Sequence, residues 1–340
     1  MEGKYPCLLT IIMPAHNAAK YIGKTIESFL LQQFTDWRLI IIDDFSKDDT
    51  WGIIQEWQQK DNRILGVQNE TNLKVARTMN KGIAMVESPY FARVDSDDVL
   101  LPDHFLKIVT FLDNHPDIDI CGSQVITIDG DGNFRRKWNY ETDPSWIKMS
   151  AIFACPFLQS SVVMRSSVIR NSEGYRPEME LVEDYELWIR LLRNHKAANI
   201  PDYTIQYRIH DNNMSEVNKT KILILLEKMY LENANFYAID HAYLKWHAKM
   251  EVGVWDGFSM VDFSTLKKWK DRLLRLGAER KLADRYLYNS IVSKYFTNAY
   301  LKIATQNRGK VKVFALLNAI KESPKWGYVI LKRKRANAKR

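Results

Sequence analysis

The sequence predicts an α/β fold in which a sheet covered by helices is followed by a separate helical region. Three observations lead to this prediction. Short apolar runs alternate with amphipathic stretches through the first half of the 340-residue chain, a glycine-containing turn then breaks the alternation, and long stretches beyond about residue 215 lack turn residues. The length suits two domains, and the 46% hydrophobic content excludes a disordered chain.

The first half of the chain contains four predicted strands. They are the short apolar runs at residues 8–13, 39–42, 64–67 and 90–94. Apolar residues at helical spacing predict helices over 21–30, 76–86 and 102–112. Ser46-Lys47-Asp48-Asp49 has the pattern of a capping box and predicts that a helix begins there and runs through Trp57. This alternation predicts a doubly wound parallel sheet.

The pattern changes after the fourth strand. Asp129-Gly130-Asp131-Gly132 follows an apolar run and predicts a hairpin, so the sheet is expected to be mixed. Further along, Tyr185 to Leu192 is an amphipathic helix, and 222–238 and 281–303 are long helices. The predicted division is a catalytic domain at 1–215, a helical region at 216–331 and a basic tail at 332–340.

Charge and cysteine content narrow the class of protein. The net charge is +8, of which +6 lies in the last nine residues, so the body is nearly neutral and no nucleic-acid partner is expected. The three cysteines are far apart, which predicts neither a disulfide framework nor a zinc cluster and fits a reducing compartment. Neither a signal peptide nor a membrane span is visible, so a cytoplasmic location is expected.

Polar residues follow several of the predicted strands. Ligands of such sheets bind beyond the carboxyl ends of the strands. Pro14 to Asn17, Asp43-Asp44 and Asp95-Ser96-Asp97-Asp98 lie at such ends, and the last group offers oxygens that suit Mg²⁺ or Mn²⁺. The structural alternative for both acidic groups is a solvated turn that caps the next helix.

Two further groups have a chemical and a structural interpretation. Glu183-Asp184 opens a predicted helix, where it is either an N-terminal cap or a rigidly held general base. His210 is either a surface histidine or, together with Arg208, part of a phosphate and metal site. No glycine-rich dinucleotide motif or P-loop is present, so carboxylates and strand-end backbone would have to bind a nucleotide.

Taken together, these motifs resemble the family 2 glycosyltransferases of the GT-A fold, in particular those that build bacterial surface polysaccharides. The resemblance covers residues 8–215 in the family's order and rests on 10–17, 26–33, 39–46, Asp95-Ser96-Asp97-Asp98, 183–188 and 207–210. It implies transfer of a sugar from a nucleotide donor with inversion at the anomeric carbon, usually with a divalent metal such as Mn²⁺ or Mg²⁺.

The resemblance also implies roles for individual residues. Those that would bind the nucleotide and the donor are Pro14, His16, Asp44, Arg77, Asp95, Asp98 and Arg208. Asp97 and His210 would hold the metal and the diphosphate, and Asp184 would be the general base beside Glu183. Two positions depart from the family pattern: His16 replaces a frequent Tyr, and Phe45 replaces a frequent Gly.

The sequence does not determine the donor sugar, the acceptor or the linkage. UDP is the default nucleotide, and the acceptor is expected to be a glycan or a lipid-linked glycan. The apolar run before the basic tail predicts binding to an anionic membrane, which would place the enzyme at the inner face of the cell membrane; a solvated tail is the alternative. A sugar-nucleotide pyrophosphorylase and a non-catalytic binding subunit are competing functions, although residues 15–22 lack the Gly and Arg that a pyrophosphorylase loop needs.

Overall fold

A computed structural model of the chain describes residues 7–210, 218–255, 257–279 and 284–323. Their contacts divide them into two compact units. The first consists of residues 7–148 and 155–210, and the second consists of residues 149–154 and 218–323. The boundary predicted at 215/216 and the basic tail at 332–340 lie outside the described residues.

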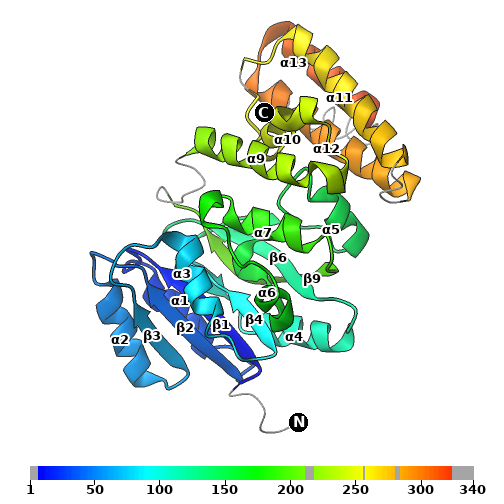
Figure 1. The fold of residues 1–340 in the computed structure, drawn as a ribbon. Coiled ribbons are helices and arrows are strands. Elements are labelled where there is room, and N and C mark those ends of the chain that lie inside the picture. The colour runs from blue at the N-terminus through cyan, green and yellow to red at the C-terminus, as the bar shows by residue number, and fades with distance from the viewer. Residues whose placement is uncertain (1–6, 211–217, 256, 280–283, 324–340) are drawn as a thin grey trace, which may run out of the picture. The chain divides into compact units, whose positions relative to one another are not determined.

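The first unit is built on one mixed sheet. Its strands are β1 (Leu9–Ala15), β2 (Trp37–Asp43), β3 (Ile64–Gln68), β4 (Tyr90–Arg93), β5 (Val99–Leu100), β6 (Ile120–Ile128), β7 (Phe134–Trp138), β8 (Val163–Arg165) and β9 (Ala197–Arg208). Within the described residues, nine strands form this sheet in the order β3-β2-β1-β4-β8-β6-β9-β5, with β7 paired to β6. Figure 1 labels six of them, β1 to β4, β6 and β9. Strands β1 to β4 pair in parallel, whereas β8 is antiparallel to both β4 and β6.

The predicted mixed sheet and its hairpin are therefore confirmed. Strands β6 and β7 are antiparallel, and the Asp129 N–H donates to the Asn133 carbonyl at 2.9 Å to close the turn between them. The register sets Ala15 of β1 beside Asp43 of β2, and Ile12 of β1 beside Arg93 of β4. The residues that follow these three strands consequently reach the same edge of the sheet.

Seven α-helices lie between the strands along the described part of this unit's chain. They are α1 (Ile22–Leu30), α2 (Thr50–Lys60), α3 (Lys74–Ile83), α4 (His104–Asn114), α5 (Pro144–Ser150), α6 (Ser166–Arg170) and α7 (Glu183–Leu191). Helix α1 buries Ile22, Ile26 and Phe29, which share one face at helical spacing. Helix α3 packs closely on β1, because a Cβ at Gly82 would lie 2.6 Å from Ile12 Cγ2. This close packing fixes the N-terminal end of α3 near the ends of β1 and β2.

The predicted capping box at residues 46–49 is wrong. Helix α2 begins at Thr50, and the Ser46 hydroxyl instead accepts the Asn17 N–H at 2.9 Å. Asp48 Oδ1 accepts both the N–H and the hydroxyl of Thr50, at 3.1 and 2.5 Å. Ser46 therefore holds the segment after β1 rather than capping the helix, and this long-range contact cannot be read from spacing along the sequence.

The second unit is helical. It contains α9 (Lys219–Tyr237), α10 (Leu244–Val252), α11 (Met260–Glu279), α12 (Arg285–Gln306) and α13 (Gly309–Glu322), shown from green to red in Figure 1. Both long helices predicted from the sequence are present, with shifted ends; residues 281–283 of the second prediction lie outside the described residues. Among the helices that the structure describes, none combines the length and the apolar character that a bilayer crossing requires.

Residues 149–154 belong to the core of this helical unit. The Phe153 ring stacks on the rings of His247 and Tyr295, with centroids 5.7 and 5.0 Å apart. His247 Nδ1 donates to the Ile152 carbonyl at 3.1 Å, and His247 Nε2 accepts from Trp269 Nε1 at 3.2 Å. Burial lowers the pKa of His247 to about 4, so this histidine is a neutral core residue.

Candidate functional site

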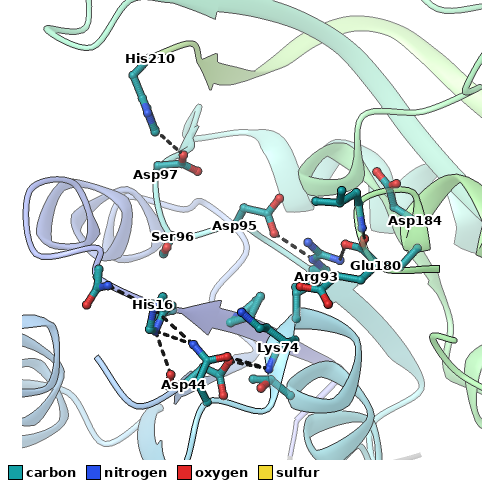
Figure 2. Close-up of a pocket in the computed structure, with 18 of the residues that line it drawn as sticks. His16, Asp44, Lys74, Arg93, Asp95, Ser96, Asp97, Glu180, Asp184 and His210 are labelled. Carbon is teal, nitrogen blue, oxygen red and sulfur yellow. Dashed lines mark hydrogen bonds and ion pairs between the residues drawn. The ribbon is translucent and has the colours of Figure 1, made fainter. Parts of the chain in front are cut away.

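The ends of β1, β2 and β4 border a cleft of about 600 Å³ in the first unit (Figure 2). Helix α3 and the segment leading into α7 supply the rest of its wall. The cleft brings together eight of the residues predicted from the sequence: Pro14, His16, Asp44, Asp95, Asp97, Glu183, Asp184 and His210.

Asp44 is held at one end of the cleft by the N-terminal end of α3. Its Oδ1 accepts from the Leu73 N–H and from Asn69 Nδ2, both at 2.8 Å, and its Oδ2 accepts from the Lys74 N–H at 2.9 Å. A carboxylate offers about four acceptor positions. Asp44 therefore retains capacity for one more donor, such as an N–H of a nucleoside base.

His16 lies beside Asp44 with its protonation defined by its partners. Its Nδ1 contacts the Asp44 carbonyl oxygen at 2.8 Å, and because a carbonyl only accepts, Nδ1 carries the proton. Its Nε2 then accepts from Asn17 Nδ2 at 3.1 Å. The His16 ring is thus neutral and held in the wall of the cleft.

Strained backbone borders this cleft. Asn17, Phe45, Lys74 and Leu181 have φ of 51, 62, 70 and 92°, in the left-handed region that favours glycine. Each such residue costs about 1–3 kcal/mol and persists only where its surroundings hold it. Phe45, which departs from the glycine of the family pattern, keeps a backbone conformation that glycine adopts readily.

A buried arginine organises the acids in the middle of the cleft. Arg93 Nε donates to Asp95 Oδ1 at 2.8 Å, and Arg93 Nη1 to Glu183 Oε1 at 3.3 Å. Burial alone would lower the pKa of Arg93, but the surrounding Asp95, Tyr175, Glu183 and Asp184 raise it well above its ordinary value. The Arg93 guanidinium stays charged and fixes both carboxylates.

Asp184 lies in the same wall without such a partner for its charge. Burial, and then the charge of Glu183, raises the pKa of Asp184 to about 7, while Arg93 opposes the rise. The side chain of Asp184 is only half-buried, and it lines the cleft. Glu183 differs because Oε1 contacts Arg93 and Oε2 accepts the Leu181 N–H at 2.9 Å. Of the pair, Asp184 is the carboxyl suited to take up a proton.

Asp97 and His210 face each other across another part of the cleft. His210 Nε2 lies 2.9 Å from Asp97 Oδ2, and the His210 ring stacks on Tyr21 with centroids 5.0 Å apart. Burial, and then the charge of Asp95, raises the pKa of the Asp97 carboxyl, while His210 opposes the rise. Among the described residues, no group of three or more His, Cys, Asp or Glu side chains is arranged to hold a metal. One carboxylate and one imidazole fit a Mn²⁺ or Mg²⁺ ion that takes its other ligands from water and phosphate.

Three predicted site residues do not line the cleft. Arg77 has an exposed side chain on α3, whose Lys74 and Thr78 do line it. Asp98 is fully buried and accepts the Arg208 N–H at 3.1 Å. Arg208 is buried as well, and its Nε donates to the Asp97 carbonyl at 2.9 Å. Asp98 and Arg208 thus support the loop that carries Asp97.

The sequence reasoning missed two cations of the cleft. Arg93 had a visible signal, because it is the charged residue in the otherwise apolar run Tyr90 to Val94. Lys74 had none, because it resembles an ordinary helix residue. In the part of the chain that the structure describes, Lys74 lines the cleft and forms no ion pair with a carboxylate.

Comparisons with known proteins agree with this geometry. The family described as Glycosyl transferase family 2 matches residues 10–190, which is more than half of the chain. The chain belongs to this family. WfaP of Escherichia coli, named a UDP-Glc:alpha-D-GlcNAc-diphosphoundecaprenol beta-1,3-glucosyltransferase, is 31% identical over 225 residues, covering 64% of this chain and 83% of WfaP.

Solved structures of other glycosyltransferases share the fold. Residues 1–349 of S. aureus TarS, in complex with UDP-GlcNAc, match with a TM-score of 0.58 at 15% identity, covering 92% of this chain and 88% of that 1–349 fragment. The mannosyltransferase PcManGT of Pyrobaculum calidifontis, in complex with GDP-Man and Mn²⁺, matches with a TM-score of 0.55 at 13% identity, covering 97% and 85%. The family 2 enzyme described above is therefore a glycosyltransferase of the GT-A fold.

Proposed function

We propose that this glycosyltransferase moves a sugar from a nucleoside diphosphate donor, with UDP as the default, to a hydroxyl of a glycan or lipid-linked glycan with inversion. The observation that carries the proposal is Asp184, a cleft carboxyl whose pKa is about 7. A general base works best when its pKa lies near the working pH. The competing interpretation of Glu183-Asp184 as a simple helix cap explains neither this pKa nor the opening of Asp184 onto the cleft.

Asp184 takes the proton of the acceptor hydroxyl as the hydroxyl oxygen attacks the anomeric carbon. The C–O bond to the donor diphosphate breaks as the new C–O bond forms, and the diphosphate leaves on the opposite face. One displacement of this kind inverts the carbon. Arg93 forms ion pairs with Asp95 and Glu183 and holds both carboxylates in place beside the base.

The other end of the cleft suits the donor. Asp44 and His16 would bind the base, consistent with the free acceptor capacity of Asp44 and the neutral ring of His16. Asp97 and His210 would hold a divalent metal, which supplies positive charge for the departing diphosphate. Lys74 would add a second positive charge at the cleft wall, where most charged side chains are acidic.

The acceptor class is proposed from the relatives. WfaP is named for transfer to a diphosphoundecaprenol-linked sugar, and other curated relatives are named for O-antigen and amylovoran biosynthesis. We extend that class, surface polysaccharide synthesis on a lipid carrier, to this chain, with action at the inner face of the membrane. The membrane contact predicted for the basic tail concerns residues 332–340, which lie outside the described residues.

Donor turnover tests the proposal directly. Purified enzyme is incubated with Mn²⁺ and a panel of nucleotide sugars, and release of the nucleoside diphosphate is measured with and without acceptor. A transferase releases UDP or another diphosphate. A pyrophosphorylase would instead release a sugar phosphate when given pyrophosphate, and a binding subunit would release nothing; either result would overturn the proposal.

A further inference from the structure

An apolar stripe lies exposed on one face of α13. Val313 and Leu317, four residues apart, are 58 and 59% exposed, and Phe314 beside them is 41% exposed. The other face of the helix buries Ala315 and Ala319. An apolar stripe on the outer face of a helix that already packs by its inner face is typical of an interaction surface.

The stripe continues onto the start of α11. Met260 and Val261 are 44 and 77% exposed. Met260 and four α13 residues, Lys310, Val313, Phe314 and Leu317, line a hollow of about 540 Å³ together with Gly309. We call this set of side chains the α13 face. Isolated exposed apolar residues are ordinary, but a contiguous set around a hollow marks an interaction surface.

The charge around the α13 face indicates what covers it. Residues 308–340 contain eleven Lys or Arg and one Glu, a net charge of +10, whereas the whole chain carries +8. The rest of the chain is therefore slightly acidic. Four of these cations, Arg308, Lys310, Lys312 and Lys321, are exposed on or beside α13.

We propose that the α13 face docks on an anionic lipid bilayer, with its apolar side chains in the interface and the four exposed cations on or beside α13 at the headgroups. Apolar side chains next to basic ones are the pattern of interfacial helices, and lysine stems can extend along the apolar surface to reach the headgroups. A second copy of this chain is a poor occupant, because two strongly basic faces repel each other. The basic tail of the same chain is a poor occupant for the same reason.

Vesicle sedimentation tests this with the full chain. The test variant is the double substitution Val313→Ser and Leu317→Ser, and the matched control is Ile224→Ser and Leu231→Ser, which changes exposed apolar residues of α9. Vesicles are pure phosphatidylcholine or contain phosphatidylglycerol. We expect wild-type protein and the control to bind anionic vesicles at least tenfold more tightly than neutral ones, and the test variant to lose at least tenfold of that binding.

Two further double variants test the electrostatic contribution to vesicle binding. Lys310→Gln with Lys312→Gln is expected to reduce the salt sensitivity of vesicle binding, whereas Lys219→Gln with Lys221→Gln on α9 is expected to leave it unchanged. Equal vesicle binding by the Val313/Leu317 variant and wild type would overturn the proposal. A wild-type dimer that this variant converts to monomer in sedimentation velocity would assign the face to a second copy instead. A lowered melting temperature with unchanged vesicle binding would assign it to packing within the chain.

Discussion

The two compact units of this enzyme bury different kinds of side chain. The GT-A unit buries seven charged residues: Asp43, Asp44, Arg93, Asp98, Glu183, Glu186 and Arg208. The helical unit, over its described residues, buries no Asp, Glu, Lys or Arg, and its core is aromatic around His247. Buried charge is costly, so the unit that contains the cleft bears a desolvation cost that the described part of the helical unit does not.

Backbone strain follows the same division. Four of the non-glycine residues with positive φ border the cleft, whereas the helical unit has one, Ala238, at the end of α9. In its described residues, the helical unit has an apolar core and little backbone strain, whereas the GT-A unit has buried charges and strained backbone around its cleft. The predictions below test that contrast, from the largest expected effect to the smallest.

Asp184→Asn is expected to lower kcat by roughly 10²- to 10⁴-fold, because it removes a positioned base. Burial raises the folded-state pKa of Asp184 above its unfolded value, so the stability that the carboxyl contributes is present below about pH 4 and is lost as the pH rises through about 7. Asn resembles the protonated form. The variant should therefore unfold at the same or a higher temperature than wild type at pH 8, and wild-type turnover by it would remove Asp184 from the mechanism.

Trp269→Ala is expected to destabilise the helical unit by about 3–5 kcal/mol, the usual cost of removing a large buried aromatic side chain. It also removes the donor to His247 Nε2. Chemical denaturation measures the change, with Trp269→Phe as a milder control. At a temperature where the variant is folded, its affinity for UDP should match that of wild type. A loss of affinity would show that the core of the helical unit also affects donor binding in the GT-A unit.

Asp97→Ala is expected to weaken UDP binding in the presence of Mn²⁺ at least tenfold, and to leave metal-free binding unchanged. The reason is that one of the two side chains suited to the ion is removed. Calorimetry with and without Mn²⁺ measures both affinities. If the affinity with Mn²⁺ stays at the wild-type value, the acidic cluster is a structural turn.

The rate should also depend on pH. Since the base works only when ionised, kcat/KM is expected to fall about tenfold for each pH unit well below 7, the pKa of Asp184. Initial rates at subsaturating donor measure the profile. A flat profile between pH 5 and 8 would contradict the assignment.

Lys74→Gly and Ala238→Gly form a matched pair that relieves positive φ in each unit. Each is expected to gain up to about 1 kcal/mol in stability from relieved strain. Only Lys74→Gly should also weaken UDP binding, because it removes a positive charge from the cleft. Equal UDP affinities for the two variants would show that the positive charge of Lys74 does not contribute to donor binding.

The sequence predicted the fold and eight of the residues that line the candidate cleft, because both rest on local signals. Apolar runs located the strands, and the residues after them, such as Asp44 and Asp97, necessarily meet at one edge of the sheet. Arg77 and Asp98 were harder, because which way a side chain points from a loop or helix depends on packing. Ser46 contacts Asn17, and the backbone of Lys74 contacts Asp44, so distant segments determine where these two residues lie. Spacing along the sequence does not predict such contacts.

The six residues 149–154 have a consequence for how the protein is made. They lie at the middle of the chain, yet Phe153 packs against Tyr295 in a core that is otherwise built from residues 218–323. A ribosome adding about 5–20 residues per second needs on the order of 10 s to proceed from Phe153 to Tyr295. During that interval the GT-A sheet can fold while the apolar segment 149–154 has not yet packed against the helices of the second unit. We therefore expect the nascent chain to expose Phe153 until the helix that carries Tyr295 has been synthesised. Chaperones that bind exposed apolar segments can act during that time.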